Sequence, residues 1–343
     1  MTTTSGARRV TLEPSGIEFD QAPGQRLLEA ARAAGVWLPF ECGWGSCGTC
    51  KAMLVTGDAE LVSEIAPALS DRDARRGRIL LCQSSATTDA TIKPLRVSDE
   101  PDPVREVRTT TGVVTSIAEV APSVVDVTLA TDEPCVFRPG QFAIVEGPQG
   151  QRRCYSLAGE SGTRSIRLVV KRYDGRPVST WMASLRVGDA VTFHAPYGDV
   201  WLRDSPRPLL MVAGGSGISA ILGLARHAAS AARDRRLTVV YGARTRADLG
   251  LLDELRDLVA THGDATLVPV VESGDPGESG DPGDPGDRGD DVRVGRVTDL
   301  IESLDAASSD VYLAGPPAMV DAVDLVLLQH GMPRDHLYVD RFG

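Results

Sequence analysis

The chain has 343 residues, of which 42% are hydrophobic and 24% charged, a composition typical of a globular protein and a length that suits two or three domains. Its formal net charge of -11 argues against nucleic-acid binding, because contacts to phosphates need a surplus of lysine and arginine. A long uncharged stretch, 208–225, carries Gly-Gly-Ser-Gly at its centre, so we interpret it as a buried strand followed by a helix and expect no membrane segment.

The N-terminal region, 8–97, has a β-rich pattern. Residues 10–13 and 16–19 alternate in polarity around Pro14 and Ser15, which predicts two strands joined by a turn. A short helix is expected from Arg26 to Ala34, ended by Gly35. The first residues of the chain are polar, without the apolar core of a signal peptide, so we expect a cytoplasmic protein.

Four cysteines in this region have the spacing C-x4-C-x2-C followed by a distant fourth, which is typical of a plant-type [2Fe-2S] cluster: Cys42, Cys47, Cys50 and Cys82. Three glycines in the loop 41–50 permit the dihedral angles that turn backbone N–H groups toward sulfur. Two other interpretations stay open, a structural zinc site and a disulfide. Zinc sites usually pair two short knuckles, and disulfides need an oxidising compartment, so we favour the iron–sulfur cluster. Cys135 and Cys154 have no motif partners and are expected to be small buried residues.

The segment 98–105, with two prolines and three acidic residues, is expected to be a linker. From 106 to 204, short runs rich in valine, threonine and isoleucine alternate with turn signals, which predicts an antiparallel barrel or sandwich. This region holds Arg152-Arg153-Cys154-Tyr155-Ser156-Leu157 and Gly175-Arg176-Pro177-Val178-Ser179-Thr180. Together these segments suit a flavin nucleotide, and an ordinary strand with a half-exposed aromatic residue is the alternative.

From 208 to 343 the pattern changes to alternating strands and helices, which predicts a doubly wound parallel sheet. Expected strands are Leu209–Ala213, Leu237–Tyr241, Thr266–Val271 and Val311–Ala314, and expected helices are Ser219–Ala232, Leu249–Thr261, Val297–Leu304 and Met319–Gln329. Gly215, Gly217 and Ala220 form a G-x-G-x-x-A pattern between a strand and a helix, where small residues let a pyrophosphate approach the backbone. A second turn, 314–317, follows a late strand, so both turns should face one crevice.

An acidic Gly/Pro/Asp-rich loop, 273–291, interrupts this last domain. Together with Glu272 it holds eight acidic residues and Arg288 as its one base. A glycine at every third position resembles collagen, but a few triplets in one chain cannot form a triple helix, so we expect a self-repelling surface loop of unknown role.

In this order, the cysteines, Arg-x-Tyr-Ser, Gly-Gly-Ser-Gly and Gly-Pro-Pro-x-Met resemble ferredoxin-NAD(P)H reductase-type flavoproteins with a fused N-terminal [2Fe-2S] domain, over nearly the whole chain. The chain is similar to reductase components of aromatic-ring dioxygenases and soluble diiron monooxygenases. The resemblance implies a β-grasp ferredoxin domain, an antiparallel β-barrel FAD domain and a doubly wound α/β NAD(P) domain. It also implies NADH as the electron source, with FAD and then the cluster passing single electrons to a Rieske or diiron oxygenase component.

The resemblance places three residues beside the reacting flavin ring: Tyr155, Ser156 and Phe342. It implies further cofactor contacts at Arg153, Leu157, Val170, Lys171, Gly175, Ser179, Thr180, Gly214, Gly215, Ser216, Gly217, Ile218, Gly315, Pro316 and Met319. Two departures from the family pattern are Ala314, where a cysteine is frequent, and Asp340-Arg341-Phe342, where Glu-x-Phe is usual.

Arg244 and Arg246 could bind a 2′-phosphate, which would favour NADPH. The NADH users of the family, however, often have Gly-Ala-Arg-Thr at this turn, as this chain does, so we expect NADH. The expected partner face surrounds Trp44, with packing inside the first domain as the alternative for that residue. A monomer is expected. Other functions that stay open are a reductase for another acceptor, such as a sugar deoxygenation dehydrase, and a non-catalytic metal-binding redox module.

Overall fold

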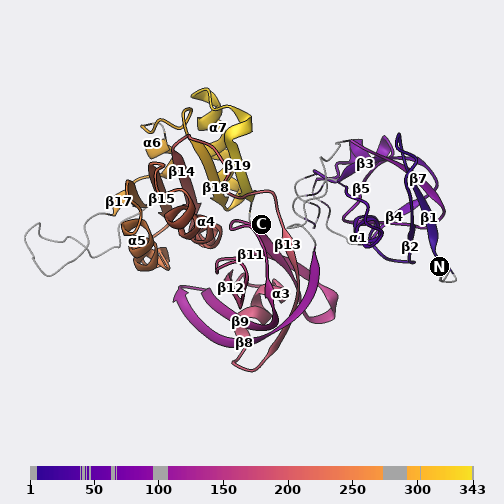
Figure 1. Ribbon diagram of the computed structural model, residues 1–343, viewed down its shortest axis with the longest axis horizontal. Coiled ribbons are helices and arrows are strands. Elements are labelled where there is room, and N and C mark those ends of the chain that lie inside the picture. The colour runs from indigo at the N-terminus through magenta and orange to yellow at the C-terminus, as the bar shows by residue number, and fades with distance from the viewer. Residues whose placement is uncertain are drawn as a thin grey trace, which may run out of the picture. The chain divides into compact units, whose positions relative to one another are not determined.

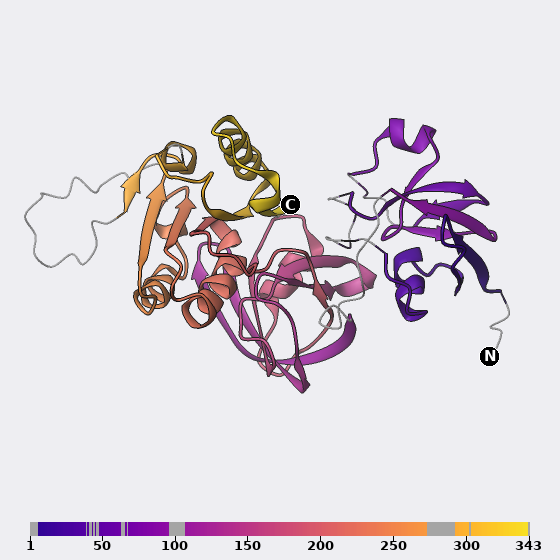
Figure 2. The ribbon, with the colours of Figure 1, turned by 45° about the horizontal axis from the view of Figure 1, so that its top comes forward.

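The structure is a computed structural model that describes residues 6–38, 40, 43, 45, 48–62, 66, 68–95, 107–272, 292–301 and 303–341. It divides into two units, Met1–Glu106 and Val107–Gly343 (Figures 1 and 2). The Trp44 hypothesis and the acidic loop 273–291 lie outside the described residues.

The first unit is built on a five-stranded mixed sheet with the order β2-β1-β7-β3-β5. Its strands are β1 (Arg8–Leu12), β2 (Glu18–Gln21), β3 (Lys51–Thr56), β5 (Arg78–Leu80) and β7 (Ala90–Pro94), and β4 (Ala59–Leu61) with β6 (Ser84–Ala86) forms a second, two-stranded sheet. β1 and β2 pair antiparallel around Pro14 and Ser15, which confirms the predicted turn. The helix α1 (Leu27–Ala33) buries four apolar residues against the sheet. Gly35, with φ of +72°, follows its last turn, which agrees with the predicted stop at this glycine.

The short helix α2 (Asp71–Arg75) was not predicted, because its five residues carry no apolar periodicity. Its N-terminus is stabilised by a capping box, in which the Ser70 hydroxyl accepts a hydrogen bond from the Asp73 backbone N–H and the Asp73 carboxylate accepts one from the Ser70 N–H. The capping box therefore offsets the weak helical signal of this segment.

The first half of the second unit is a six-stranded antiparallel sheet with the order β11-β10-β13-β8-β9-β12. An antiparallel bridge between Leu157 and Leu168 joins the two outer strands, so the sheet closes on itself. The barrel rather than the sandwich is therefore formed. Its strands are β8 (Arg108–Ala121), β9 (Val124–Cys135), β10 (Phe142–Glu146), β11 (Arg152–Ser156), β12 (Thr163–Lys171) and β13 (Ala190–Tyr197), and it carries the 3-10 turn η2 (Pro148–Gly150) and the helix α3 (Pro177–Ser184).

The second half is a six-stranded parallel sheet with the order β17-β16-β15-β14-β18-β19. Its strands are β14 (Leu209–Gly214), β15 (Leu237–Ala243), β16 (Ala265–Val271), β17 (Arg293–Val294), β18 (Asp310–Gly315) and β19 (Leu337–Arg341). Helices α4 (Ile218–Ala231) and α5 (Leu252–Ala260) share one apolar core with the sheet, and α6 (Val297–Ile301) and α7 (Pro317–Gln329) share another. The doubly wound prediction is confirmed, and its expected strands are all present.

Three differences from the predicted elements have local causes. α5 begins at Leu252 instead of Leu249, because the 3-10 turn η4 (Arg246–Asp248) comes first and Leu251 adopts a left-handed conformation with φ of +63°. α7 begins two residues early because Pro317 suits the first helical position. β19 was missed because it pairs only at the edge of the sheet, after the 3-10 turn η5 (Arg334–His336), and its side chains are half-buried or exposed.

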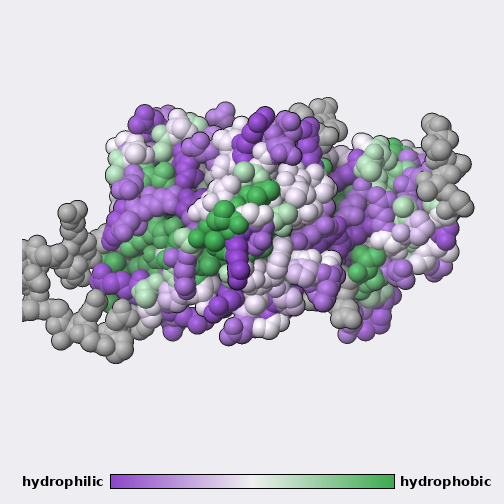
Figure 3. All heavy atoms as spheres, turned by 90° about the horizontal axis from the view of Figure 1, so that it is seen from below, coloured by the Kyte–Doolittle hydropathy of each residue, from purple (hydrophilic) through white to green (hydrophobic). Residues whose placement is uncertain are grey.

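The stretch 208–225 is divided between β14 and α4, as predicted, with the 3-10 turn η3 (Gly215–Gly217) between them. Across the described residues, no helix has both the length and the apolar character needed to cross a bilayer. Figure 3 shows one face of the molecule, where hydrophilic residues surround smaller apolar patches.

Candidate functional site

Two of the four predicted cluster ligands can be placed, and they meet. Cys50 and Cys82 are buried and have their sulfur atoms 3.2 Å apart. That separation is well beyond a disulfide bond of about 2.0 Å and close to the roughly 3.8 Å between two thiolates on one tetrahedral metal. The pair therefore fits a metal cluster, and the disulfide alternative does not apply to it. Cys42 and Cys47 lie outside the described residues.

The surroundings of these thiols are arranged for a cluster loop. Gly43, Gly45 and Gly48 have φ of +69°, +96° and +75°, which confirms that the loop needs glycine. The Gln83 amide, buried beside Cys82, donates a hydrogen bond to the Gly43 carbonyl at 3.2 Å and approaches the Cys82 sulfur at 3.9 Å. Gln83 was missed in the sequence, because a single amide next to a ligand has no pattern of its own.

Lys51, which follows Cys50, is held in place by a buried carboxylate. Asp73 accepts hydrogen bonds from Lys51 and Arg78 at 2.8 Å each and from the Ser70 hydroxyl at 2.9 Å. These donors, Lys51 first, hold the pKa of Asp73 well below its usual range. The strand that leaves the cluster loop is thus fixed by a charged network.

The two glycine turns of the parallel sheet lie together at its carboxyl edge. A Cβ on Gly217 would stand 2.3 Å from the Ala314 carbonyl oxygen, and one on Gly214 would stand 2.3 Å from the Met319 sulfur. β14 and β18 are neighbours in the sheet, although the chain visits β15, β16 and β17 between them. The turns therefore sit at a topological switch point, the usual place for a nucleotide in this architecture.

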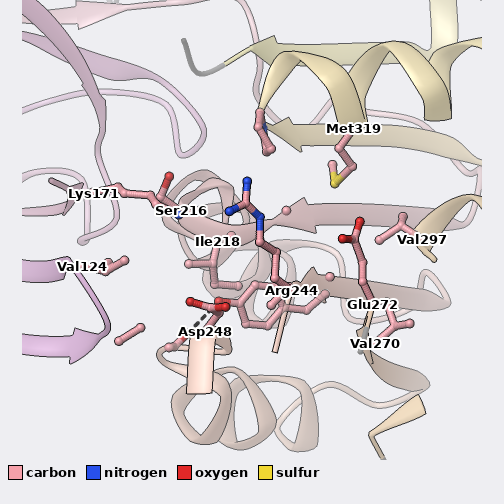
Figure 4. Close-up of a pocket in the computed structure, with 18 of the residues that line it drawn as sticks. Val124, Lys171, Ser216, Ile218, Arg244, Asp248, Val270, Glu272, Val297 and Met319 are labelled. Atoms are coloured by element: carbon pink, nitrogen blue, oxygen red, sulfur yellow. Dashed lines mark hydrogen bonds between the residues drawn. The ribbon is translucent and has the colours of Figure 1, made fainter. Parts of the chain in front are cut away.

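A cavity of about 560 Å³ opens at this edge, a volume in the range of small-molecule sites. Its wall comes from both halves of the second unit. The barrel supplies Val120, Ala121, Val124, Val169, Lys171 and Tyr173, and the parallel sheet supplies both glycine turns and the ends of β15 and β16. In Figure 4, Val124 and Lys171 approach from one side, and Val297, Val270 and Met319 lie on the other.

Charged groups of both signs line this cavity. Arg244 lies between Asp248 and Glu272 in the close-up (Figure 4). Asp248 accepts hydrogen bonds from the Thr245 backbone N–H and hydroxyl, at 3.2 and 2.9 Å, so its carboxylate is fixed by the turn after β15. Tyr241 donates to the Gly250 carbonyl at 2.9 Å, and burial raises the pKa of its phenol. The phenol therefore stays protonated and holds the cavity wall.

Several predicted contacts line the cavity and others do not. Lys171, Gly214, Gly215, Ser216, Ile218, Pro316 and Met319 line it, while Gly217 and Gly315 provide close packing behind it. The predicted flavin contacts on the barrel lie outside its lining: Arg153, Tyr155, Ser156, Leu157, Val170, Gly175, Ser179 and Thr180. Phe342 is outside the described residues.

One buried hydroxyl in the barrel is suited to contact a cofactor. The Ser156 side chain is fully buried, and its hydroxyl has no hydrogen-bond partner in the described part of the chain. Such a group normally has a partner, so this hydroxyl fits a site for a polar cofactor atom. Tyr155 is buried beside it in the barrel core, and desolvation raises the pKa of its phenol. Leu157 and Val170 are fully buried core residues.

The segment 175–180, which was predicted to suit a flavin nucleotide, spans the start of α3. The Ser179 hydroxyl accepts a hydrogen bond from the Tyr173 N–H and donates to the Arg176 carbonyl, each at 3.2 Å. Thr180 donates to the Tyr173 carbonyl at 3.4 Å. Both hydroxyls therefore stabilise the loop that brings Tyr173 to the cavity. Tyr173 was missed because no motif contains it.

Other expectations about single residues have mixed outcomes. Ala314 is buried at the end of β18, where its carbonyl faces Gly217, so a small residue suits this position. Cys135 and Cys154 are half-buried instead of buried. Cys135 is the last residue of β9, and desolvation raises the pKa of its thiol to about 11. The Cys135 thiol is therefore a poor nucleophile at neutral pH.

Comparison with known proteins agrees with this architecture. Three family models match: the 2Fe-2S iron–sulfur cluster binding domain at residues 10–87, the oxidoreductase FAD-binding domain at 111–201 and the oxidoreductase NAD-binding domain at 211–324. The chain is 31% identical to the reductase component of propane 2-monooxygenase from Rhodococcus jostii, over 97% of this chain and 91% of the relative. It is 34% identical to the ferredoxin–NAD(+) reductase component of an alkene monooxygenase system from Xanthobacter autotrophicus, over 95% and 98%.

A solved structure has a similar fold. The cytochrome P450 reductase from Amycolatopsis is 28% identical and has a TM-score of 0.83, with 98% of each chain covered. The iron–sulfur, FAD-binding and NAD-binding domains thus follow one another in this order along the chain. The chain belongs to the family of reductase components of multicomponent oxygenase systems, which are flavin- and iron–sulfur-dependent oxidoreductases.

Proposed function

We propose that this chain oxidises NADH and delivers the electrons singly, through FAD and the [2Fe-2S] cluster, to the oxygenase component of a monooxygenase. The observation that carries the proposal is the cavity shared by the barrel and the carboxyl edge of the parallel sheet. A site with one wall from each domain can hold a nicotinamide donor against a flavin acceptor. Flavin, when bound, accepts a hydride pair and releases electrons one at a time, which is the form that a [2Fe-2S] cluster accepts.

The residue roles follow the sequence prediction. Arg153 binds a flavin phosphate and Tyr155 lies against the ring system. The Ser156 hydroxyl, which has no partner among the described residues, supplies a hydrogen bond to the ring system. The loop ordered by Ser179 and Thr180 contributes to the same cofactor site. Phe342 covers the ring. Cys42, Cys47, Cys50 and Cys82 hold the cluster.

The nicotinamide nucleotide binds on the other wall. Its pyrophosphate approaches the backbone of Gly214–Gly217, and the turn of Gly315, Pro316 and Met319 closes the opposite edge. We propose NADH over NADPH because the carboxylates of Asp248 and Glu272 share the cavity with Arg244. A carboxylate suits a ribose 2′-hydroxyl and repels a 2′-phosphate.

We propose the domain limits 8–97, 106–204 and 208–343, with the linker 98–105, and a monomeric protein of the cytoplasm. A monooxygenase acceptor is supported by the relatives, which include reductase components of propane, phenol and alkene monooxygenases. The relative that reduces a cytochrome P450 adds a haem protein to the Rieske and diiron acceptors expected from the sequence.

An anaerobic titration tests the proposal. Purified protein, reconstituted with iron, sulfide and FAD, should show flavin and iron–sulfur absorption bands that bleach when NADH is added. A colourless preparation would contradict the cofactor assignment. Coloured protein that dithionite reduces and NADH does not would contradict the assignment of the cavity, and a strong preference for NADPH would contradict the choice of nucleotide alone.

A further inference from the structure

Four charged side chains join the barrel to the nucleotide-binding half of the second unit. Arg167 on β12 donates hydrogen bonds from Nε and Nη2 to the Asp126 carboxylate on β9, at 2.9 and 2.6 Å. Its Nη1 and Nη2 also donate to the two carboxylate oxygens of Glu254 on α5, at 2.6 and 2.7 Å. Arg226 on α4 donates to Glu254 at 2.8 Å and to the Ala158 carbonyl at 2.6 Å. We call Asp126, Arg167, Arg226 and Glu254 the Glu254 clamp.

The clamp is electrically balanced and shielded. Its two guanidinium groups face two carboxylates, and its side chains are 17–30% exposed. The hydrogen bonds from Arg167 are the main cause of a lowered pKa of Glu254, so this carboxylate stays ionised. A bidentate pair of a guanidinium and a carboxylate fixes the orientation of the two side chains as well as their distance. Removing one partner leaves the charge of the other shielded from water and uncompensated.

On the barrel, the clamp and the cavity occupy the same strand face. Side chains alternate along a strand, so Arg167, Val169 and Lys171 of β12 point to one side. Val169 and Lys171 line the cavity, and so does Val124 on β9, two residues from Asp126. In the pairing of these strands, Val169 stands opposite Asp126. The barrel end of the clamp is therefore continuous with the cavity wall.

On the nucleotide-binding half, the clamp holds the elements that form the opposite wall. Glu254 lies in the first turn of α5, directly after Gly250 and Leu251, which line the cavity. Leu251, in its left-handed conformation, packs against the barrel cluster of Ala121, Val124, Ala158 and Val169. A Cβ on Gly250 would stand 2.9 Å from the Ala121 Cβ, so the two halves are in close contact here. Arg226 anchors α4, which begins at the cavity residue Ile218.

We propose that the Glu254 clamp sets the separation of the two cavity walls, and that Glu254 is a positioning residue for hydride transfer from NADH to the flavin. This inference rests on the proposed function. The transfer moves two electrons and a proton from the nicotinamide to the flavin ring and leaves NAD⁺, so its rate depends on the distance between the two rings. A misplacement of about 1 Å can reduce such a rate on the order of 100-fold. Nucleotide affinity depends on other groups, the glycine turns and the sheet edge.

The test is single-turnover reduction of the FAD-loaded, full-length protein by NADH, followed by flavin absorbance without oxygen. The variant is Glu254→Gln, which keeps the shape and removes the charge. Its limiting reduction rate should fall about 10-fold or more, while the NADH dissociation constant stays within about twofold. With NADH deuterated at the transferred position, the isotope effect should persist, which shows that hydride transfer is still the step observed.

Asp253→Asn is the matched control. Asp253 precedes Glu254 in the first turn of α5, so both substitutions remove one favourable charge at the helix N-terminus. The Asp253 side chain, however, is 93% exposed and pairs with Arg256 on its own helix. The Asp253→Asn protein should therefore reduce its flavin at the rate of the unsubstituted protein. Glu254→Asp keeps the charge on a side chain that is one methylene shorter, so its flavin reduction rate should lie between those of Glu254→Gln and the unsubstituted protein. This variant provides a second test if Glu254→Gln does not fold.

The outcomes separate the clamp from the function on which it rests. A folded Glu254→Gln or Glu254→Asp protein that reduces its flavin within twofold of the unsubstituted rate would overturn the positioning role. An equal loss in Asp253→Asn would assign the effect to the helix terminus instead. If NADH fails to reduce the unsubstituted protein, the proposed function itself is wrong.

Discussion

The cluster site of the first unit and the cavity of the second unit differ in how far apart their residues lie in the chain. Three of the cluster cysteines fall within 42–50 and the fourth is Cys82. The cavity wall draws on residues from Val120 to Ala322, on both a barrel and a parallel sheet. A cluster needs only a few ligands, most of them close together in the sequence, so a local motif is enough to predict it. A cavity between two domains forms only after both domains have folded, so no local motif predicts it.

The two sites also use their small residues differently. In the cluster loop, Gly43, Gly45 and Gly48 supply backbone conformations with positive φ. At the sheet edge, Gly214 and Gly217 have negative φ and instead supply room, because Met319 and the Ala314 carbonyl occupy the space of a side chain. Substitutions should therefore affect the first site through its ligands and the second through its packing.

The largest effect is expected from Cys82→Ser, which removes a cluster ligand with little change in shape. The cluster should be lost, and reduction of cytochrome c, a one-electron acceptor, should fall by about 100-fold or more. Reduction of the flavin by NADH should continue at its normal rate, because the flavin and the cavity belong to the second unit. Iron analysis and single-turnover flavin reduction measure the two results. Retention of the iron would show that Cys82 is not a ligand.

Gly217→Ala should disturb the cavity and leave the cluster intact. The added Cβ would stand 2.3 Å from the Ala314 carbonyl oxygen, and backbone atoms cannot rotate away, so β14 and β18 must separate at their carboxyl ends. We expect a loss of about 1–3 kcal/mol in the free energy of unfolding and an increase of about 10-fold or more in the NADH dissociation constant. Gly263→Ala, in an exposed bend where φ is not left-handed and the nearest atom to an added Cβ is 3.4 Å away, controls for the general effect of a glycine substitution. Unchanged NADH binding would mean that the nucleotide does not use this turn.

The contrast explains which features could be predicted from the sequence. The parallel sheet was predictable because β14, β15 and β18 are short apolar runs, each followed by turn residues and a helix pattern. Tyr173, Glu272 and Gln83 were missed because each reaches its site through tertiary packing, without a motif. The Glu254 clamp could not be predicted from the sequence for the same reason, because Arg167 and Glu254 are 87 residues apart in the chain.

Ser156→Ala tests the proposed flavin contact within the barrel. The hydroxyl is buried without a partner among the described residues, so its removal should leave the FAD-free protein as stable as before or up to about 1 kcal/mol more stable. With FAD bound, the same change should slow flavin reduction by about 10-fold, because the proposed hydrogen bond to the ring is lost. Thermal unfolding with and without FAD, and single-turnover kinetics, provide the two measurements.

Ser84→Ala is the control for Ser156→Ala, which should slow flavin reduction without lowering the stability of the FAD-free protein. Ser84 is also buried, and its hydroxyl likewise has no partner in the described part of the chain, but it belongs to the first unit. Its removal should leave flavin reduction unchanged. A Ser156→Ala protein that is strongly destabilised without FAD would show that the hydroxyl has a structural partner instead.

The smallest effect is a pH dependence confined to the first unit. The pKa of Asp73 is lowered in the folded protein by Lys51 and Arg78, so the stability that it contributes is fully present above its unfolded pKa, near pH 4, and is lost as the pH falls further. In Asp73→Asn this contribution is absent at every pH. The difference in urea midpoint between the two proteins, followed by cluster absorbance, should therefore be constant from pH 7 to about 5 and narrow below about pH 4. A difference that widens on acidification would show that the carboxylate is not stabilised by these two cations, and the flavin signal of the second unit should show no difference at any pH.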